Sequence, residues 1–179
     1  MPFYIDKMTQ DYMGLTRNFT VNPYSCKNPL HYENYLKFCA ISDQKRGIGV
    51  THVLIDEHEE TKQKKIAGFI TLKATSLTKS YEDYDEGHPA LEIAELAIDK
   101  EYERRGLGTL LVQFAITTAA ILNEEFLGIE YVVLCADPEA VNFYSKDTFG
   151  FKRLEEYYNV PREGWNVNCI PMFLKVTLG

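Results

Sequence analysis

Hydrophobic and polar positions along the chain follow two different periods, which predict helices and strands in turn. Apolar residues recur at i, i+3, i+4 and i+7 over 107–122, which predicts a long helix with one buried face. A weaker pattern predicts a helix over 30–42, and a short helix is expected over 139–146. Runs rich in β-branched and other apolar residues predict strands at 50–55, 66–72, 91–98, 131–135 and 170–176. This order is typical of a mixed α/β domain.

Polar segments between these elements predict exposed loops. Residues 21–29 carry two prolines and two asparagines and lead into the first helix, and residues 79–89 are acidic and rich in turn-forming residues. There is no internal repeat and no low-complexity linker. The 179 residues are therefore expected to form one domain, spanning 1–179.

Composition and charge exclude several classes of protein. Hydrophobic residues make up 45% and charged residues 25%, which excludes collagen, coiled coils and disorder. The formal net charge is −7, so a general attraction to nucleic acid or to an anionic membrane is not expected, although a local basic groove stays possible. No uninterrupted apolar run approaches the length that crosses a bilayer, and no secretion signal begins the chain. We expect a cytoplasmic protein.

Cysteine and histidine spacings predict no metal site. Neither residue type shows the spacing of a metal ligand set or a CxxC pair. We expect reduced, mostly buried thiols at Cys26, Cys39, Cys135 and Cys169.

The segment 91–108 carries the clearest chemical signal. A strand ends, a charged turn follows, and Gly106 and Gly108 open the long helix. The first turn of a helix presents unpaired backbone N–H groups, and glycine lets an anion approach them closely. Arg104 and Arg105 add positive charge. We expect a pyrophosphate to bind over 104–109, a loop completed by Leu107 and Thr109.

Two common pyrophosphate motifs do not fit. A dinucleotide fingerprint needs a third glycine where Leu111 stands, and the Gly-Lys-Ser/Thr of a P-loop is absent. The remaining pattern, [Q/R]xxGx[G/A], belongs to coenzyme A sites, and here the chain resembles the GNAT family of N-acetyltransferases. Glu103 stands where that family usually has Gln or Arg. Residues 44–49 (QKRGIG) match the letters better, but they lead into a strand, so no helical N–H groups would meet an anion there.

A second GNAT pattern, N/DxxAxxFY followed by Gly-Phe, lies downstream. It reads here as Asp137, Ala140, Phe143 and Tyr144, followed by Gly150-Phe151. Tyr144 lies two residues farther from the Gly-Phe pair than is usual, which suggests a distorted helix end. The resemblance covers about residues 1–176.

The resemblance implies a GNAT fold, a mixed and mostly antiparallel sheet of six to seven strands with helices on both faces. Acetyl-CoA would bind where two central parallel strands, 91–98 and 131–135, splay apart. Its arm would pair with the backbone of Leu96, Ala97 and Ile98, and Asn142 would contribute a further contact. Tyr144 would protonate the departing thiolate.

A carboxylate on the strand before the loop would accept a proton from the amine. Glu92 and Glu95 are three residues apart, so in a regular strand they face opposite sides. We prefer Glu95, which is nearer the acetyl end.

The acceptor amine is open at this stage. A small molecule or peptide ranks first. Segments of the N-terminal third resemble a GNAT subgroup that includes toxins acetylating aminoacyl-tRNA, which makes tRNA the second candidate. A sensor that binds acetyl-CoA without transfer is a third. Homodimers are common in the family, and the acidic residues of 82–86 would suit a polycationic substrate if they are more than a solvated loop.

Overall fold

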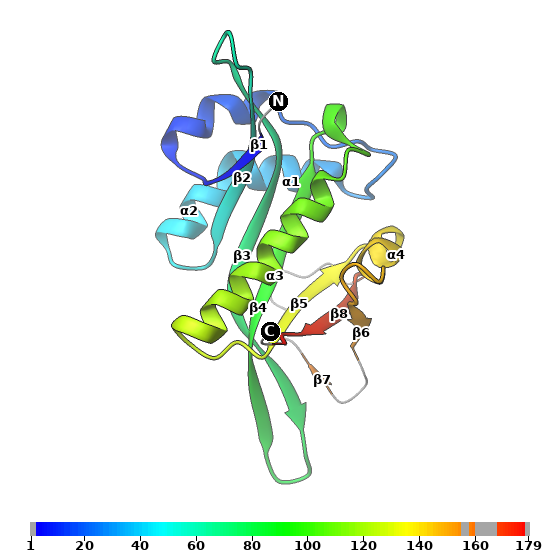
Figure 1. Cartoon of the computed structure of the whole chain (residues 1–179). Coiled ribbons are helices and arrows are strands. Elements are labelled where there is room, and N and C mark those ends of the chain that lie inside the picture. Colours follow the sequence, from blue (N-terminus) through cyan, green and yellow to red (C-terminus); the bar gives the residue numbers. More distant parts are fainter. Residues whose placement is uncertain (1–2, 155–157, 160–167, 178–179) are drawn as a thin grey trace. The chain divides into compact units, whose positions relative to one another are not determined.

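The computed structural model describes residues 3–154, 158–159 and 168–177. The chain divides into two compact units, which are described separately here. Unit 1 comprises residues 1–72 and 95–111, and unit 2 comprises residues 73–94 and 112–179. Figure 1 shows the elements of both.

The strands form one mixed sheet in the order β1-β2-β3-β4-β5-β8-β6, and β7 pairs with β3. β4 and β5 run parallel. The pairs β1–β2, β2–β3, β3–β7, β5–β8 and β6–β8 are antiparallel. The predicted mixed, mostly antiparallel sheet is confirmed. The strands are β1 (Phe3–Lys7), β2 (Val50–Glu57), β3 (Lys64–Ser80), β4 (Asp85–Ile98), β5 (Tyr131–Ala136), β6 (Lys152–Arg153), β7 (Tyr158–Asn159) and β8 (Ile170–Lys175).

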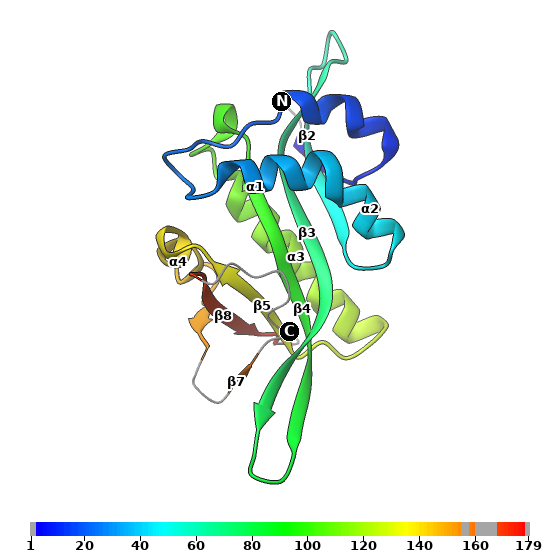
Figure 2. The ribbon, with the colours of Figure 1, turned by 180° about the vertical axis from the view of Figure 1, so that it is seen from behind.

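A helical stretch covers one face of the sheet in unit 1 (Figure 2). It consists of α1 (Pro29–Asn34), the π-turn η2 (Tyr35–Cys39) and α2 (Ala40–Lys45), and it follows the 3₁₀ helix η1 (Gln10–Asn18). Alternate residues of a strand face one side of a sheet. Leu36 and Ala40 of the helical stretch accordingly share a buried cluster with Val53, Ile55 and Phe69 of β2 and β3.

The opposite face of unit 1 contacts the start of α3 (Leu107–Glu125). A Cβ built on Gly68 would lie 2.6 Å from Cδ1 of Ile98, 3.0 Å from the carbonyl oxygen of Ala97 and 3.4 Å from Cδ1 of Leu111. A larger residue here would force the side chain of Ile98 and its surroundings to shift, because β4 and α3 approach β3 closely at this point. Helices lie on both faces of this part of the sheet, as expected.

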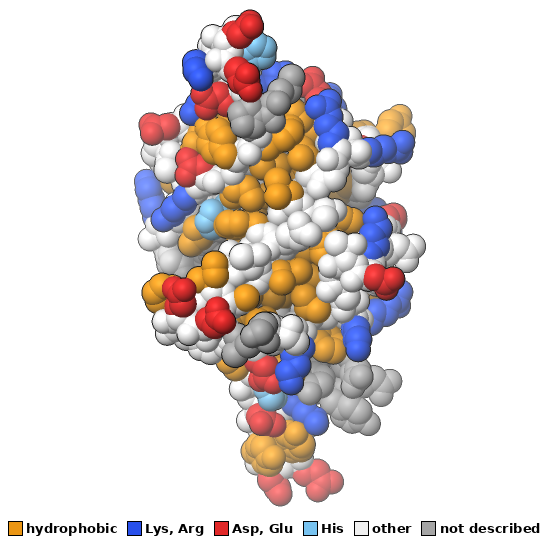
Figure 3. Space-filling model, in the orientation of Figure 1, with side chains coloured by type: hydrophobic (Ala, Val, Ile, Leu, Met, Phe, Trp, Pro, Cys, Tyr) orange, Lys and Arg blue, Asp and Glu red, His pale blue; other side chains and the backbone are white. Residues whose placement is uncertain are grey.

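The predicted loop over 79–89 is wrong in part. β3 continues to Ser80 and β4 already begins at Asp85, so only the tip is a turn. The rings of Tyr81 and Tyr84 stack across that tip with centroids 4.7 Å apart. Acidic composition correctly indicated exposure, and acidic side chains mark this end of the hairpin in Figure 3. It did not indicate backbone pairing, because a strand exposed on both faces lacks the apolar alternation used to find strands.

Unit 2 contains residues 73–80 of β3, residues 85–94 of β4, and the strands β5, β6, β7 and β8. It also contains the rest of α3, the 3₁₀ turn η4 (Pro138–Ala140) and α4 (Val141–Tyr144). Its core includes Leu77, Ala90, Tyr131 and Val133, with Phe173 packed against them. The short helix predicted over 139–146 is thus a 3₁₀ turn followed by four α-helical residues.

One expectation about the cysteines is wrong. Cys135 of β5 and Cys169 form a disulfide, with Cα atoms 5.4 Å apart. The antiparallel register aligns Cys135 of β5 with Pro171 of β8. Cys169 directly precedes β8, so it lies next to β5. Sequence spacing could not show this, since the two cysteines are 34 residues apart. Cys26, which is partly buried, and Cys39, which is exposed, are not disulfide-bonded.

Helix α3 is long and apolar enough to cross a membrane by length and composition alone. Threonines and Gln113 interrupt its apolar runs, so no uninterrupted apolar stretch marks this helix in the sequence. A core helix of a globular domain has the same properties. The buried positions of α3 follow the pattern of such a core helix, because they recur along one face at Leu111, Val112, Ala115 and Ala119.

Candidate functional site

The predicted phosphate loop lies in unit 1, between the 3₁₀ turn η3 (Lys100–Tyr102) and α3. Arg104 has a φ of 61° and Gly106 a φ of 77°, so two left-handed residues flank Arg105. Such alternation turns successive N–H groups toward one concave side, which is the form of an anion-binding nest. A left-handed arginine is uncommon, and strained backbone of this kind gathers at ligand sites.

Space for an anion exists at this loop. A Cβ built on Gly106 would meet no heavy atom within 4 Å, and the loop from Arg104 to Gly106 is exposed. Arg105 is held in place, because its Nη2 donates to the carbonyl of Glu101 at 2.9 Å and its guanidinium lies over the ring of Tyr102. Arg104 and Arg105 give this loop positive charge, and the guanidinium of Arg105 has a defined orientation.

Asp99 fixes the approach to the loop. This carboxylate is 4% exposed and accepts hydrogen bonds from the backbone N–H of Thr20 at 2.8 Å and of Glu101 at 2.9 Å. Its own N–H donates to the carbonyl of Ala67 on β3 at 2.9 Å. A buried carboxylate with several backbone donors keeps a fixed position. Sequence reasoning missed Asp99, since nothing local marks its distant partners.

Glu103 anchors a neighbouring loop. Its carboxylate accepts hydrogen bonds from Nδ2 of Asn22 at 2.9 Å and from Oγ of Ser25 at 3.2 Å. The position where GNAT proteins usually have Gln or Arg is therefore occupied here by a residue that holds the 21–28 segment beside the phosphate loop. This contact is also invisible in the sequence.

Glu95, the preferred proton acceptor, contacts His31 of α1. Nε2 of His31 lies 2.9 Å and 3.0 Å from the two carboxylate oxygens of Glu95. The side chain of Glu95 is 15% exposed and that of His31 is 46% exposed. His31 was given no role by its spacing in the sequence, and only the packing of α1 against β4 brings it to Glu95.

Glu92, the alternative carboxylate, has a different environment in unit 2. It is 3% exposed, and its Oε2 lies 3.9 Å from Nζ of Lys73 on β3. A buried ion pair of this kind is usually structural, because either charge alone would be costly to bury. Glu95 is the more accessible of the two carboxylates.

The backbone that would meet the cofactor's arm lies at the end of β4. In unit 2, Ala90–Ile93 of β4 pair with Tyr131–Leu134 of β5. β4 then continues to Ile98 in unit 1, through Leu96 and Ala97. These are the residues for which backbone pairing with acetyl-CoA is expected.

Tyr144 ends α4 in unit 2 and is 8% exposed. Its ring makes edge contacts with Phe143 at 4.9 Å and Phe151 at 5.9 Å between centroids. Burial raises the pKa of its phenol, and the charge of Asp137 adds to this effect. Tyr144 is therefore protonated throughout the physiological range, as a proton donor must be.

The remaining predicted contacts have unremarkable surroundings. Thr109 and Gly108 are partly buried in the first turn of α3, Leu107 is buried, and Asn142 is exposed on α4. Within the described parts of the chain, no group of three potential metal ligands is found. Unit 1 holds Glu95, the end of β4 and the phosphate loop, whereas Tyr144 and Asn142 belong to unit 2.

The competing letter match over 44–49 is not a helix start. α2 ends at Lys45, β2 begins at Val50, and Gly47 between them has a φ of 72°. Its glycines therefore close a helix and open a strand, as the sequence context predicted.

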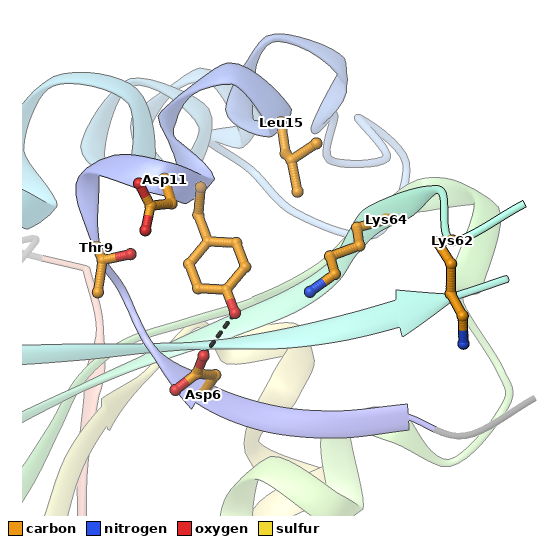
Figure 4. Close-up of a pocket in the computed structure, with 7 residues that line it drawn as sticks. Asp6, Thr9, Asp11, Leu15, Lys62 and Lys64 are labelled. Carbon is orange, nitrogen blue, oxygen red and sulfur yellow. Dashed lines mark hydrogen bonds between the residues drawn. The ribbon is translucent and has the colours of Figure 1, made fainter. Parts of the chain in front are cut away.

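A separate pocket of about 500 Å³ lies in unit 1 between β1, η1 and the β2–β3 turn. Figure 4 shows its lining, in which Tyr12 donates to Asp6 at 2.5 Å. Lys62 and Lys64 approach from the turn. None of the predicted site residues lines it.

Comparisons with known proteins agree with this fold. A Tyr-to-Phe mutant of the toxin AtaT is 18% identical over 97% of this chain and 89% of that one, with a TM-score of 0.74. AtaT complexed with acetyl-methionyl-tRNAfMet is 18% identical over 95% and 94% of the two chains, with a TM-score of 0.71. AtaTR bound with acetyl-CoA is 20% identical over 97% and 93%, with a TM-score of 0.67.

No curated protein matches the chain. The model of the acetyltransferase (GNAT) family, however, matches residues 14–151, most of the chain and all the elements from α1 to α4. The chain belongs to the GNAT family of acetyltransferases, enzymes that use acetyl-CoA.

Proposed function

We propose that this acetyltransferase moves the acetyl group of acetyl-CoA to the amino group of an aminoacyl-tRNA. The observation that carries the proposal is the similarity to AtaT along nearly the whole chain, since that toxin is known as a complex with acetyl-methionyl-tRNAfMet. Sequence reasoning ranked a small-molecule or peptide amine first. The neighbouring structures favour the alternative.

The distribution of charge removes the main objection to an RNA substrate. Unit 1 contains 12 basic and 12 acidic residues, and unit 2 contains 7 basic and 14 acidic ones, so the whole net charge of −7 belongs to unit 2. Much of the affinity of a protein for RNA comes from electrostatic contacts with the phosphates, and these contacts need local positive charge on the protein. Unit 1 carries exposed basic side chains at Arg17, Lys45, Arg46, Lys62, Lys64, Lys65, Lys100, Arg104 and Arg105. Of these, Arg46, Lys62, Lys64 and Lys65 also lie within 4 Å of a carboxylate.

The cofactor's diphosphate would be held by the loop over 104–109. The left-handed backbone at Arg104 and Gly106 and the open space above Gly106 support this assignment. Backbone groups of Leu96, Ala97 and Ile98 would pair with the pantetheine arm, and Asn142 would add a contact from α4. Acetyl-CoA supplies the thioester from which the acetyl group is taken.

Two side chains would move the protons. Glu95 would take one from the ammonium of the acceptor, and the neutral amine would attack the thioester carbonyl directly. Tyr144 would donate a hydrogen bond, and finally a proton, to the departing thiolate. Its raised pKa makes it a weaker acid than a free phenol, so stabilisation of the thiolate by the hydrogen bond is the larger part of its role.

Labelled acetyl-CoA tests the proposal. The purified chain would be offered a pool of aminoacyl-tRNA, the same pool after deacylation, a set of polyamines and a set of lysine peptides. We expect label on charged tRNA alone, released by mild base as an N-acetyl amino acid. Label on a polyamine or peptide but not on charged tRNA would contradict the proposal and restore the small-amine acceptor.

A further inference from the structure

His31 is the contact of Glu95 that the family motifs do not include. It lies on α1 in unit 1, and Glu95 lies near the end of β4 in the same unit. A single nitrogen, Nε2 of His31, is within 3.0 Å of both carboxylate oxygens. With a hydrogen on Nε2, the imidazole donates to an ionised Glu95 in a shared hydrogen bond.

The contact with His31 restricts the position of the Glu95 carboxylate, which a proton acceptor needs. A glutamate side chain has three rotatable bonds, so a partly exposed carboxylate samples several positions unless something holds it. The imidazole also makes an edge contact with Tyr32, with ring centroids 5.2 Å apart. Glu95 faces the side of β4 on which Ala97 joins the cluster beneath the helical stretch, which explains why α1 supplies the partner.

We propose that His31 is the positioning residue for Glu95, holding its carboxylate where it accepts the proton of the acceptor's ammonium. The inference rests on the amine acetylation proposed above. The proton passes from nitrogen to Glu95, the N–C bond forms as the C–S bond breaks, and the thiolate receives its proton from Tyr144. His31 keeps its own proton on Nε2 throughout, so it touches neither reactant.

Protonation of His31 gives the pair a pH dependence. An imidazolium beside Glu95 would form an ion pair with it, and this pair would compete with the acceptor's ammonium for the same carboxylate oxygens. Tyr35 of η2 also faces Glu95. Burial raises the pKa of Tyr35, with the charge of Glu95 among the smaller causes, so this phenol stays neutral in the same range. Acetyl transfer is therefore expected to fall as His31 becomes protonated.

Nuclear magnetic resonance tests the coupling without any acceptor. In the parent chain the titration of the His31 ring is followed, and the titration is repeated in Glu95→Gln. We expect the midpoint of His31 to move to lower pH by on the order of one unit, because an adjacent anion favours imidazolium. An unmoved midpoint would overturn the inference, whichever acceptor the enzyme uses.

Kinetics test the role. His31→Ala is expected to lower kcat about tenfold on aminoacyl-tRNA and to leave the KM for acetyl-CoA unchanged, since only part of a general-base contribution is lost. His31→Gln, which keeps an N–H donor at a similar reach, should recover most of kcat. Its kcat should no longer decrease over the pH range in which His31 becomes protonated in the parent chain. His58→Gln, an exposed histidine of the β2–β3 turn, is the matched control and should behave as the parent.

A double mutant separates positioning from an independent structural effect. In the Glu95→Gln background, His31→Ala should cost nothing more, because residues that act as a unit are not additive. An equal tenfold loss in both backgrounds would overturn the inference. Failure of the proposed function has a different signature, in which the parent chain acetylates a small amine but not charged tRNA, and the same variants are then measured on that amine. A parent chain that transfers acetyl to none of the acceptors would overturn the inference as well.

Discussion

Nδ2 of Asn22 donates a hydrogen bond to the carboxylate of Glu103 over 2.9 Å, joining segments 81 residues apart. The contact ties the loop before α1 to the residue that precedes the phosphate nest. In the proposed function it also places a negative charge next to the loop that would hold the cofactor's diphosphate. Glu103 would then lower the attraction for the cofactor in exchange for order in the 21–28 segment.

Glu103→Gln tests this exchange. The variant keeps one acceptor oxygen for Asn22 and Ser25 but removes the charge, so acetyl-CoA should bind a few-fold more tightly, by about 1 kcal/mol or less at this partly exposed position. Calorimetry measures the change. Glu101→Gln, two residues earlier and exposed, serves as the control for loss of a charge. Weaker binding in Glu103→Gln would show that loop order outweighs repulsion.

Gly106→Val should abolish acetyl-CoA binding. The left-handed φ of 77° is costly for a β-branched residue, by roughly 1–2 kcal/mol or more, and the added methyl groups would occupy the space above the amides. Gly47→Val is a matched control, because Gly47 has a φ of 72° and equally open surroundings. Both variants should lose similar stability in thermal melts. If the two variants bound acetyl-CoA with equal affinity, the proposal that phosphate binds at Gly106 would be contradicted.

Tyr144→Phe should lower kcat by about 10²–10⁴-fold while acetyl-CoA affinity and melting temperature stay close to those of the parent. The ring would remain packed against Phe143 and Phe151, and only the hydroxyl would be lost. Tyr84→Phe, at the exposed hairpin tip, controls for loss of a phenol. A parent-like kcat would mean that the thiolate leaves without help from Tyr144.

Stability should fall in mild acid through His52. Burial lowers the pKa of this histidine on β2, and repulsion from Lys7 lowers it further. The unfolded chain therefore binds a proton below about pH 6.5 that the folded chain resists, so the free energy of unfolding decreases from about pH 7 toward the lowered pKa. Urea unfolding at about pH 8 and about pH 5.5 measures this. His52→Gln should flatten the dependence, and His58→Gln should leave it unchanged.

Reduction should weaken unit 2. The Cys135–Cys169 disulfide closes a 34-residue interval, and chain entropy predicts a loss of about 3–4 kcal/mol when it is opened. Melting with and without a thiol reductant, with mass spectrometry to count free thiols, measures the effect. Cys169→Ser should reproduce the reduced state, and Cys39→Ser should not. A parent chain whose stability ignores the reductant would contradict the prediction.

Much of the fold could be predicted, because its core elements have strong periodicity. The helix over 107–122 and the strands over 50–55 and 131–135 lie within α3, β2 and β5. β1 and η1 were not predicted, since their short, partly exposed segments show little alternation. The π-turn inside the first helical stretch was also beyond prediction, because it arises from packing and not from a local residue signal.

The candidate site divides in the same way. Local motifs predict a phosphate loop over 104–109 and a role for Tyr144, and the left-handed backbone at Arg104 and Gly106 and the helix start at Leu107 fit the first of these predictions. The supports of those motifs come from distant segments: His31 for Glu95, Thr20 for Asp99 and Asn22 for Glu103. Such pairs depend on which segments the fold brings together, and a single sequence contains no direct sign of them.

The turn over 44–49 has a practical consequence. A pattern search that insists on Gln or Arg before the two glycines passes over Glu103 and selects Gln44, so it would assign the cofactor contacts to six residues that connect a helix to a strand. Variants designed from such an assignment would change the connection between α2 and β2 and leave the loop over 104–109 intact. Their unimpaired activity would then be misread as evidence against acetyl-CoA. For chains of this kind, backbone handedness combined with the element that follows identifies the loop more safely than its letters do.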